Sequence, residues 1–154
     1  MRSLFIMPES IIPLMTGRIE SVMITPEKGK TKMLRDIKIL IVDDQPRTRR
    51  SLKALLSTCV RADVIREAAG GMEAVQVVQE AHPDLVLMDV QMPGMDGLQA
   101  TRLIKASWPS VSIIALSMYN DYRVEALAAG ASAFISKGDS PDSLLEAIEK
   151  MAAN

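Results

Sequence analysis

The sequence contains little of what an exported or membrane-bound chain needs. Its single cysteine, Cys59, excludes an internal disulfide framework and favours a reducing compartment. No apolar run approaches the roughly 20 residues that cross a bilayer. Prolines interrupt the apolar start MRSLFIMPES, where a signal peptide would have a continuous apolar segment. We therefore predict a cytoplasmic protein with no membrane contact.

An excess of positive charge is also missing. The chain has 18 Lys and Arg against 19 Asp and Glu, so it has no net field that would attract a nucleic-acid backbone. With one His and one Cys, a Cys/His zinc site is excluded as well. The sequence predicts no direct nucleic-acid binding, and no zinc.

The character of the chain changes near residue 37. A length of 154 residues suits one domain with an appendage. Residues 1–36 hold scattered prolines and the polar stretch PEKGKTK, without a sustained helical or strand period. We predict an N-terminal extension or linker over 1–36 and one domain over 37–154.

From residue 38 onward, short β-branched runs alternate with segments of helical period. The predicted strands are 38–43, 62–68, 84–89, 110–117 and 132–137. Between the first two, Leu52, Leu55, Leu56 and Cys59 recur at helical spacing. Five strands alternating with five helices predict a parallel α/β sheet that is covered on both faces.

Charged and hydroxyl side chains follow four of these strands. The first strand ends in Asp43 and Asp44, the third in Asp89, the fourth in Ser117 and the fifth in Lys137. Each has an ordinary alternative: a helix cap or solvated strand end for the first pair, a turn hydroxyl for the serine, a solvated side chain for the lysine. Because ligands sit beyond the carboxyl ends of parallel strands, their common location favours a functional site.

Clustered carboxylates repel one another unless a cation lies between them. Mg²⁺, for which Mn²⁺ can substitute, prefers oxygen ligands and binds through one or two carboxylates and a substrate phosphate. A metal with a nearby lysine and hydroxyl suits phosphoryl transfer, in which a carboxylate can be the nucleophile. Asp89 is the best nucleophile candidate because it ends the central buried strand and a loop follows it.

Four blocks of the sequence occur in an order and spacing that identify a family. They are ILIVDD at 39–44, LVLMDVQMPGMDG at 85–97, IIALS at 113–117 and GASAFISKG at 130–138. With them, the stretch from 37 to 153 resembles the receiver domain of bacterial two-component response regulators. The resemblance implies a flavodoxin-like, doubly wound sheet of five parallel strands in the order 2-1-3-4-5.

The resemblance also implies roles for the acidic residues. Asp89 is expected to be the phosphoacceptor, taking the phosphoryl group from a phosphohistidine on a sensor histidine kinase or phosphotransfer protein. Asp44 is expected to bind Mg²⁺ directly and Asp43 through water, with Asp89 and the backbone carbonyl of Gln91 as further ligands. The chain would then be a signalling switch rather than an enzyme, limited to self-catalysed phosphoryl transfer and autodephosphorylation.

Further roles follow from the same resemblance. Lys137 would pair with the phosphoryl group, Ser117 would hydrogen-bond it, and Phe134 matches the family's aromatic switch position. Phosphorylation would shift the face formed by the fourth helix, fifth strand and fifth helix between two arrangements. Phe134 also has a simpler interpretation as a core aromatic. Gln91 and Tyr119 flank the site and are candidates for tuning the phosphate lifetime.

The sequence departs from the family at the residue after the lysine. Gly138 stands where the family often has a cis proline, and we expect a trans bond there. With SMYND at 117–121, this resembles the subfamily that usually carries a helix-turn-helix output domain. Either the chain is a stand-alone receiver or an output domain lies outside it, and a homodimer on phosphorylation is a further expectation.

Other interpretations stay open from the sequence. The main alternative is a receiver-like module that acts through protein contacts without phosphate. A flavodoxin-like cofactor binder would need a Ser/Thr-rich phosphate loop after the first strand, where Asp43 and Asp44 would instead repel phosphate. A haloacid-dehalogenase-type phosphatase would need a DxD arrangement there, which DDQP at 43–46 does not match. Asp96 is assigned to a turn or helix cap and His82 to a solvated turn. A run of basic residues is assigned to a solvated helix face, with a docking surface as the alternative: Arg47, Arg49, Arg50 and Lys53.

Overall fold

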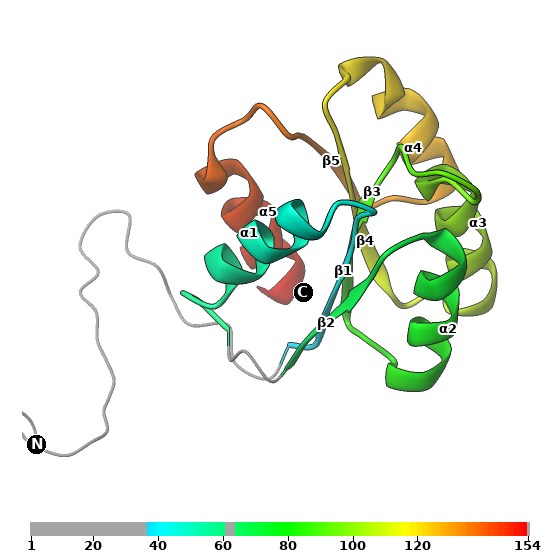
Figure 1. Ribbon diagram of the computed structural model, residues 1–154, viewed down its shortest axis with the longest axis horizontal. Helices are drawn as coiled ribbons and strands as arrows, with labels where there is room; N and C mark the ends of the chain where they lie inside the picture. The colour runs from blue at the N-terminus through cyan, green and yellow to red at the C-terminus, as the bar shows by residue number, and fades with distance from the viewer. Residues whose placement is uncertain (1–36, 61–63, 154) are drawn as a thin grey trace, which may run out of the picture. The chain divides into compact units, whose positions relative to one another are not determined.

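A five-stranded parallel sheet forms the centre of the domain. The computed structural model describes residues 37–60 and 64–153, and its strands lie in the order β2-β1-β3-β4-β5 (Figure 1). The strands are β1 Ile39–Val42, β2 Ile65–Ala68, β3 Leu85–Asp89, β4 Ser112–Ser117 and β5 Ala133–Ser136. The helices are α1 Pro46–Leu56, α2 Gly71–Ala81, α3 Gly97–Ser107, α4 Arg123–Ala129 and α5 Pro141–Ala153, with a 3-10 turn, η3, at Asn120–Tyr122. The predicted flavodoxin-like fold and strand order are confirmed.

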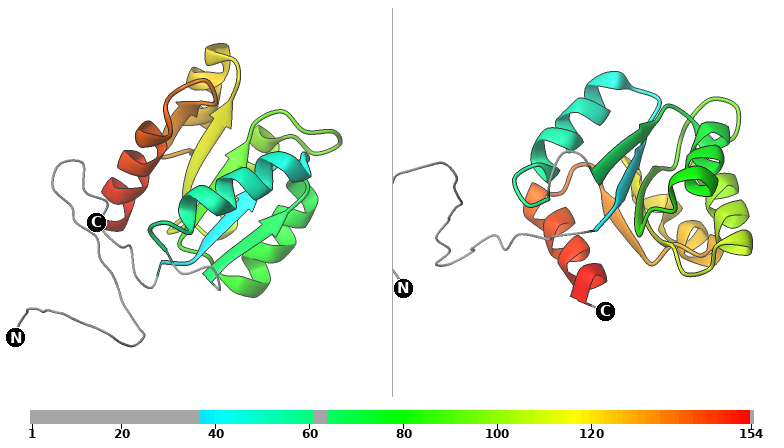
Figure 2. Two further views of the ribbon diagram at one scale, coloured as in Figure 1. Left: turned by 60° about the vertical axis from the view of Figure 1, so that its left-hand side comes forward. Right: turned by 90° about the horizontal axis from the view of Figure 1, so that it is seen from below.

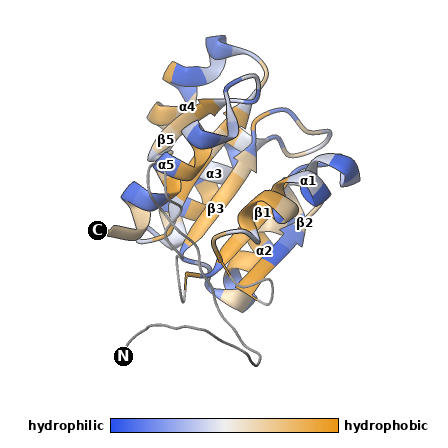
Figure 3. Ribbon diagram, turned by 90° about the vertical axis from the view of Figure 1, so that its left-hand side faces the viewer, coloured by the Kyte–Doolittle hydropathy of each residue, from blue (hydrophilic) through white to orange (hydrophobic). Residues whose placement is uncertain are grey.

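Helices cover both faces of the sheet, as Figures 1 and 2 show. On one face, Leu56 of α1 and Ile148 of α5 pack against alternate residues of β1, β3 and β4. On the other face, Val78 of α2 and Ile104 of α3 pack against the intervening strand residues, while α4 packs nearby through Ala126. Burial on both sides explains why these strands are continuous apolar runs, visible as the hydrophobic centre of Figure 3.

Local sequence signals set the ends of several helices. Pro46 occupies the first turn of α1, and His82 ends α2 in the left-handed conformation at φ 50°. The Asp96 carboxylate caps α3 by accepting from the Gln99 backbone N–H at 2.8 Å, which confirms its assignment as a cap. The N-cap of α1 is Gln45, without a side-chain hydrogen bond, so Asp44 does not cap that helix.

Several of the remaining predictions can be compared directly with the described residues. Cys59 is buried in the core, and His82 is exposed, as expected. Within residues 37–60 and 64–153 every peptide bond is trans, including that before Gly138. No helix in this part of the chain is both long and apolar enough to span a bilayer. The predicted extension over 1–36 lies outside the described residues, so its boundary stays a prediction.

Candidate acidic site at the carboxyl edge of the sheet

Three carboxylates meet at the carboxyl ends of β1 and β3. The strands pair with Val42 opposite Met88, which places the next residues, Asp43 and Asp89, side by side. Asp44 follows directly, and carboxylate oxygens of all three residues lie within 4.8 Å of one another. Asp43 and Asp89 are buried, with 1% and 4% of their surfaces exposed. The structure thus brings together the acids that the sequence selected.

Lys137 reaches this cluster from the end of β5, across β4. Its Nζ lies 2.9 Å from Asp43 Oδ2 and 3.0 Å from Asp89 Oδ1. Its backbone N–H donates to the carbonyl of Ser117 at 2.8 Å, which fixes the start of its side chain beside the end of β4. One ammonium therefore bridges the two buried carboxylates.

Burial and neighbouring charges set the proton affinities of this cluster. Burial raises the pKa of Asp89 to about 6, and the Asp43 carboxylate adds to the rise, while Lys137 and a backbone hydrogen bond from Gln91 oppose it. Burial alone would lower the pKa of Lys137, but its hydrogen bonds and attraction to Asp43 and Asp89 raise it. The lysine therefore stays charged at neutral pH, and Asp89 is mostly ionised.

The charge of the cluster matches a divalent cation. Three carboxylates and one ammonium leave a formal charge of about −2 when all are ionised. Uncompensated charge at the edge of a core is costly, and a hard cation with oxygen ligands would remove that cost. The donor set of Asp43, Asp44 and Asp89 could therefore hold a metal ion.

Asp43 is held in place by Arg49, a basic residue that the sequence assigned to a solvated helix face. Arg49 of α1 donates from Nη1 to the Asp43 carbonyl at 2.7 Å and pairs through Nε with Glu67 of β2 at 3.1 Å. Its side chain is only 17% exposed, so its assignment to a solvated face is wrong. Arg47 and Arg50 are exposed as predicted, and Lys53 is 41% exposed beside Glu67. The contacts of Arg49 link β1, β2 and α1 behind the acids.

Gly97 is a further residue of the site, and no local sequence signal singles it out. It begins α3, and a Cβ at this position would lie 2.0 Å from the carbonyl oxygen of Asp89. Its N–H also donates to the carbonyl of Val90 at 2.8 Å. Only a residue without a side chain allows α3 to start this close to the backbone of Asp89.

The two predicted switch residues lie on the neighbouring strands β4 and β5. Ser117 is buried at the end of β4, and its hydroxyl accepts from the Tyr119 backbone N–H at 3.0 Å. Phe134 of β5 is 4% exposed and packs in a small cluster with Leu98 and Ala126 among others. Its burial agrees with both the core and the switch interpretations, so its role stays a prediction.

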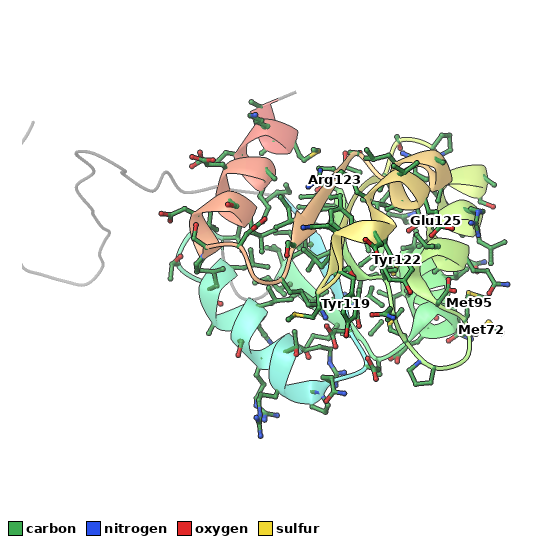
Figure 4. All side chains as sticks on the ribbon, turned by 90° about the horizontal axis from the view of Figure 1, so that it is seen from above. Met72, Met95, Tyr119, Tyr122, Arg123 and Glu125 are labelled. Carbon is green, nitrogen blue, oxygen red and sulfur yellow. The ribbon has the colours of Figure 1, made fainter. Side chains whose placement is uncertain are left out.

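The two residues proposed to tune the phosphate lifetime are both exposed. Tyr119 is 58% exposed on the loop after β4. Gln91 follows Asp89 by two positions, and its side-chain Nε2 donates to the Tyr122 hydroxyl at 3.1 Å. Figure 4 shows Tyr119 and Tyr122 together on the segment that leads into α4. Tyr122 was not selected from the sequence, because nothing local marks it as a partner of Gln91.

A doubly wound sheet with acids at the carboxyl ends of β1 and β3 and a lysine after β5 defines the receiver class of signalling domains. The family model described as the response regulator receiver domain matches residues 39–149. The chain belongs to this family.

Known relatives and solved structures agree with this assignment. The chain is 41% identical over 114 residues to the transcriptional regulatory protein LnrK of Bacillus subtilis, covering 73% of this chain and 52% of the relative. It is 38% identical to the response regulator protein VraR of Staphylococcus saprophyticus, covering 77% and 57%. The chain thus spans about half the length of the curated relatives it matches.

Two crystal structures resemble the fold closely. A LuxR-family two-component response regulator from Aurantimonas superposes with a TM-score of 0.68 at 33% identity, covering 75% of this chain and 84% of that one. The response regulator domain of Thermotoga maritima CheB gives a TM-score of 0.69 at 30% identity, covering 77% and 97%. These structures support the same receiver fold.

Proposed function

We propose that the chain is a phosphorylation-controlled switch with Asp89 as its phosphoacceptor. The observation that carries the proposal is the bridge from Lys137 to Asp43 and Asp89, at 2.9 and 3.0 Å, beside the third carboxylate of Asp44. A buried carboxylate with a fixed cation and two acidic neighbours suits nucleophilic attack on phosphorus.

The nucleophile is an oxygen of the Asp89 carboxylate. A pKa of about 6 leaves it mostly ionised at neutral pH, and its burial leaves it poorly hydrated. In the forward step this oxygen bonds to the phosphorus of a phosphohistidine, the P–N bond breaks, and its electrons return to the imidazole. Lys137 is placed to pair with a phosphoryl oxygen, since it already contacts Asp89.

The acidic residues would hold Mg²⁺, for which Mn²⁺ can substitute. Asp43, Asp44, Asp89 and the Gln91 carbonyl are the proposed ligands. When bound, the ion supplies positive charge that offsets the phosphoryl oxygens. The formal charge of about −2 on the acids and lysine supports a divalent rather than a monovalent ion.

Ser117 and Phe134 would convert the chemical change into a change of shape. The Ser117 hydroxyl can donate its proton to a phosphoryl oxygen, and this would draw in the end of β4 and the loop after it. Phe134 lies in the small cluster beneath that loop and α4. We propose that phosphorylation favours one of two arrangements of α4, β5 and α5.

The proposed partners follow from the relatives. A sensor histidine kinase or phosphotransfer protein would supply the phosphoryl group, in the cytoplasm. The relatives are about twice as long as the matched region and are named transcriptional regulatory proteins, so an output domain outside this chain is proposed to bind DNA. Homodimerisation on phosphorylation belongs to the same proposal. The chain itself would catalyse only its own phosphorylation and dephosphorylation.

Mass spectrometry of the intact chain tests the proposal. The chain is incubated with a small acyl phosphate donor, with Mg²⁺ or with a chelator. We expect one added phosphoryl group with Mg²⁺, none with chelator, and none on Asp89→Asn. Asp96→Asn is the matched control because asparagine caps a helix as well as aspartate does, and it should be phosphorylated normally. A folded wild-type chain that takes up no phosphoryl group would favour the phosphate-independent module.

A further inference from the structure

The side chain of Gln91 is tied to the beginning of α4 by Tyr122. Its Nε2 donates to the Tyr122 hydroxyl at 3.1 Å, across 31 positions of sequence. Gln91 and Tyr122 both line an open groove between the loop after β3 and the segment before α4, and neither Asp43, Asp44 nor Asp89 lines it. The amide nitrogen is therefore directed towards the α4 side, in a groove that the carboxylates do not line.

The position of Tyr122 is set by the packing of its aromatic ring. The ring packs against a cluster of buried residues that includes Phe134, and Arg123 stacks on the Phe134 ring at 4.9 Å. The Tyr122 backbone N–H contacts the Tyr119 carbonyl at 3.4 Å. Figure 4 labels Tyr122 and Arg123 on the same segment at the start of α4. The Tyr122 hydroxyl is thus fixed by the packing of its ring, whereas the Gln91 side chain is exposed.

We infer that Tyr122 is a positioning residue that sets the lifetime of the phosphoryl group through Gln91. The inference rests on the proposed function. In hydrolysis a water oxygen bonds to phosphorus, the P–O bond to Asp89 breaks with its electrons left on the carboxylate, and a water proton leaves with the phosphate or to solvent. Because Gln91 is only two residues from Asp89, we infer that the position of its amide decides whether this path is open or closed.

Whether Tyr122 lengthens or shortens the phosphate lifetime depends on the Gln91 amide donor with which it forms a hydrogen bond. An amide NH₂ released from Tyr122 can donate to the phosphoryl oxygens, which stabilises the phosphoaspartate and obstructs the approach of water. While the hydroxyl accepts from Nε2, one of these donor protons is occupied and the side chain is kept aside. Tyr122 therefore shortens the lifetime of the phosphorylated state.

The test compares rates of phosphate loss. Wild type, Tyr122→Phe, Gln91→Ala and the double variant are phosphorylated with a small acyl phosphate and Mg²⁺, the donor is removed, and the adduct is followed by intact mass. Tyr122→Phe keeps the ring that packs near Phe134 and removes only the hydroxyl. We expect it to lose phosphate about three- to tenfold more slowly than wild type. In the Gln91→Ala background the same substitution should have no effect.

The outcomes separate this inference from the proposed function. No adduct on folded wild type would overturn both. An adduct on wild type that Tyr122→Phe loses at the same rate or faster would overturn only the role of Tyr122. An equal slowing with and without Gln91 would overturn it too, because the hydroxyl would then act through another contact. Val124→Ala, on the same helix and 75% exposed, is the control, and an equal slowing there would implicate general disturbance of α4.

Discussion

The acidic side and the α4 side of the same sheet edge are built differently. The acidic side comprises Asp43, Asp44, Asp89 and Lys137, each at the end of a strand. Lys137 bridges Asp43 and Asp89 by short ionic contacts, and the Asp44 carboxylate lies within 4.8 Å of the other two acids. The α4 side comprises residues 118–129, a loop, the single turn η3 and a helix of 7 residues.

Exposure differs as much as construction. The α4 side has four large exposed apolar residues, namely Met118, Tyr119, Val124 and Leu127. On the acidic side, Asp43 and Asp89 are almost wholly buried. Regions with few buried contacts open at low free-energy cost. The chemistry is thus fixed by the sheet, and the segment beside it is the one suited to move.

The largest expected effect is on the acidic side, at Gly97. In Gly97→Ala the added methyl group would overlap the Asp89 carbonyl oxygen, so α3 or the end of β3 must shift. We expect a loss of about 3 kcal/mol or more in the free energy of unfolding, measured with urea. Gly70→Ala is the control, since nothing lies within 4 Å of its added methyl, and it should change stability by less than about 1 kcal/mol. Equal stabilities would contradict the close approach.

The next effect is the pH dependence that the buried Asp89 carboxylate gives to stability. Its folded pKa of about 6 lies above the ordinary aspartate value of 3.8, so the folded state binds the proton more tightly. Without divalent cations, the stability that protonated Asp89 contributes to the fold is therefore full below about pH 4. This stability is lost as the pH rises through about 6. Relative to Asp89→Asn, wild type should lose up to about 3 kcal/mol over this range. A difference between the two that does not change with pH would contradict the raised pKa.

Lys137→Met should have a smaller effect. It leaves Asp43 and Asp89 buried without their shared cation, at a cost of about 2 kcal/mol at neutral pH. The matched variant is Lys53→Met, whose partner Glu67 lies 3.5 Å away in a more exposed pair and which should cost less than about 1 kcal/mol. Urea unfolding in chelator measures both. Similar losses would mean that burial does not distinguish the two pairs.

The smallest expected effect lies on the α4 side. Arg123→Ala removes the cation that stacks on Phe134 and should cost about 0.5–1 kcal/mol. Arg123→Lys, which keeps the charge, should recover part of this in thermal unfolding. A loss as large as that of Lys137→Met would mean that the α4 side is held as firmly as the acidic side.

The alternation of strands and helices and the acidic side could be predicted from sequence because their signals are local, whereas the strand order came from the family resemblance. A buried strand reads as an apolar run, and a charge at its end stands out against that run, as at Asp89. Parallel pairing then brings the strand ends to one edge of the sheet. The capping role of Asp96 could also be predicted, because an acid followed by glycine before a helix is typical of a cap.

The residues that were missed depend on contacts between distant parts of the chain. Arg49 was placed on a solvated face, but it reaches Glu67, which is 18 positions away. The pairing of Gln91 with Tyr122 spans 31 positions. Gly97 has no side chain to interpret, and its importance comes from the Asp89 backbone that packs against it. None of these relations has a sequence period or a motif.

The most direct measurement locates the phosphoryl group on the chain. Borohydride reduces a phosphorylated aspartate to homoserine, which peptide sequencing by mass spectrometry assigns to one residue. After treatment with an acyl phosphate and Mg²⁺, we predict homoserine at position 89 alone. Homoserine at 43, 44 or 96, or none on the folded chain, would contradict the assignment of Asp89 as the phosphoacceptor.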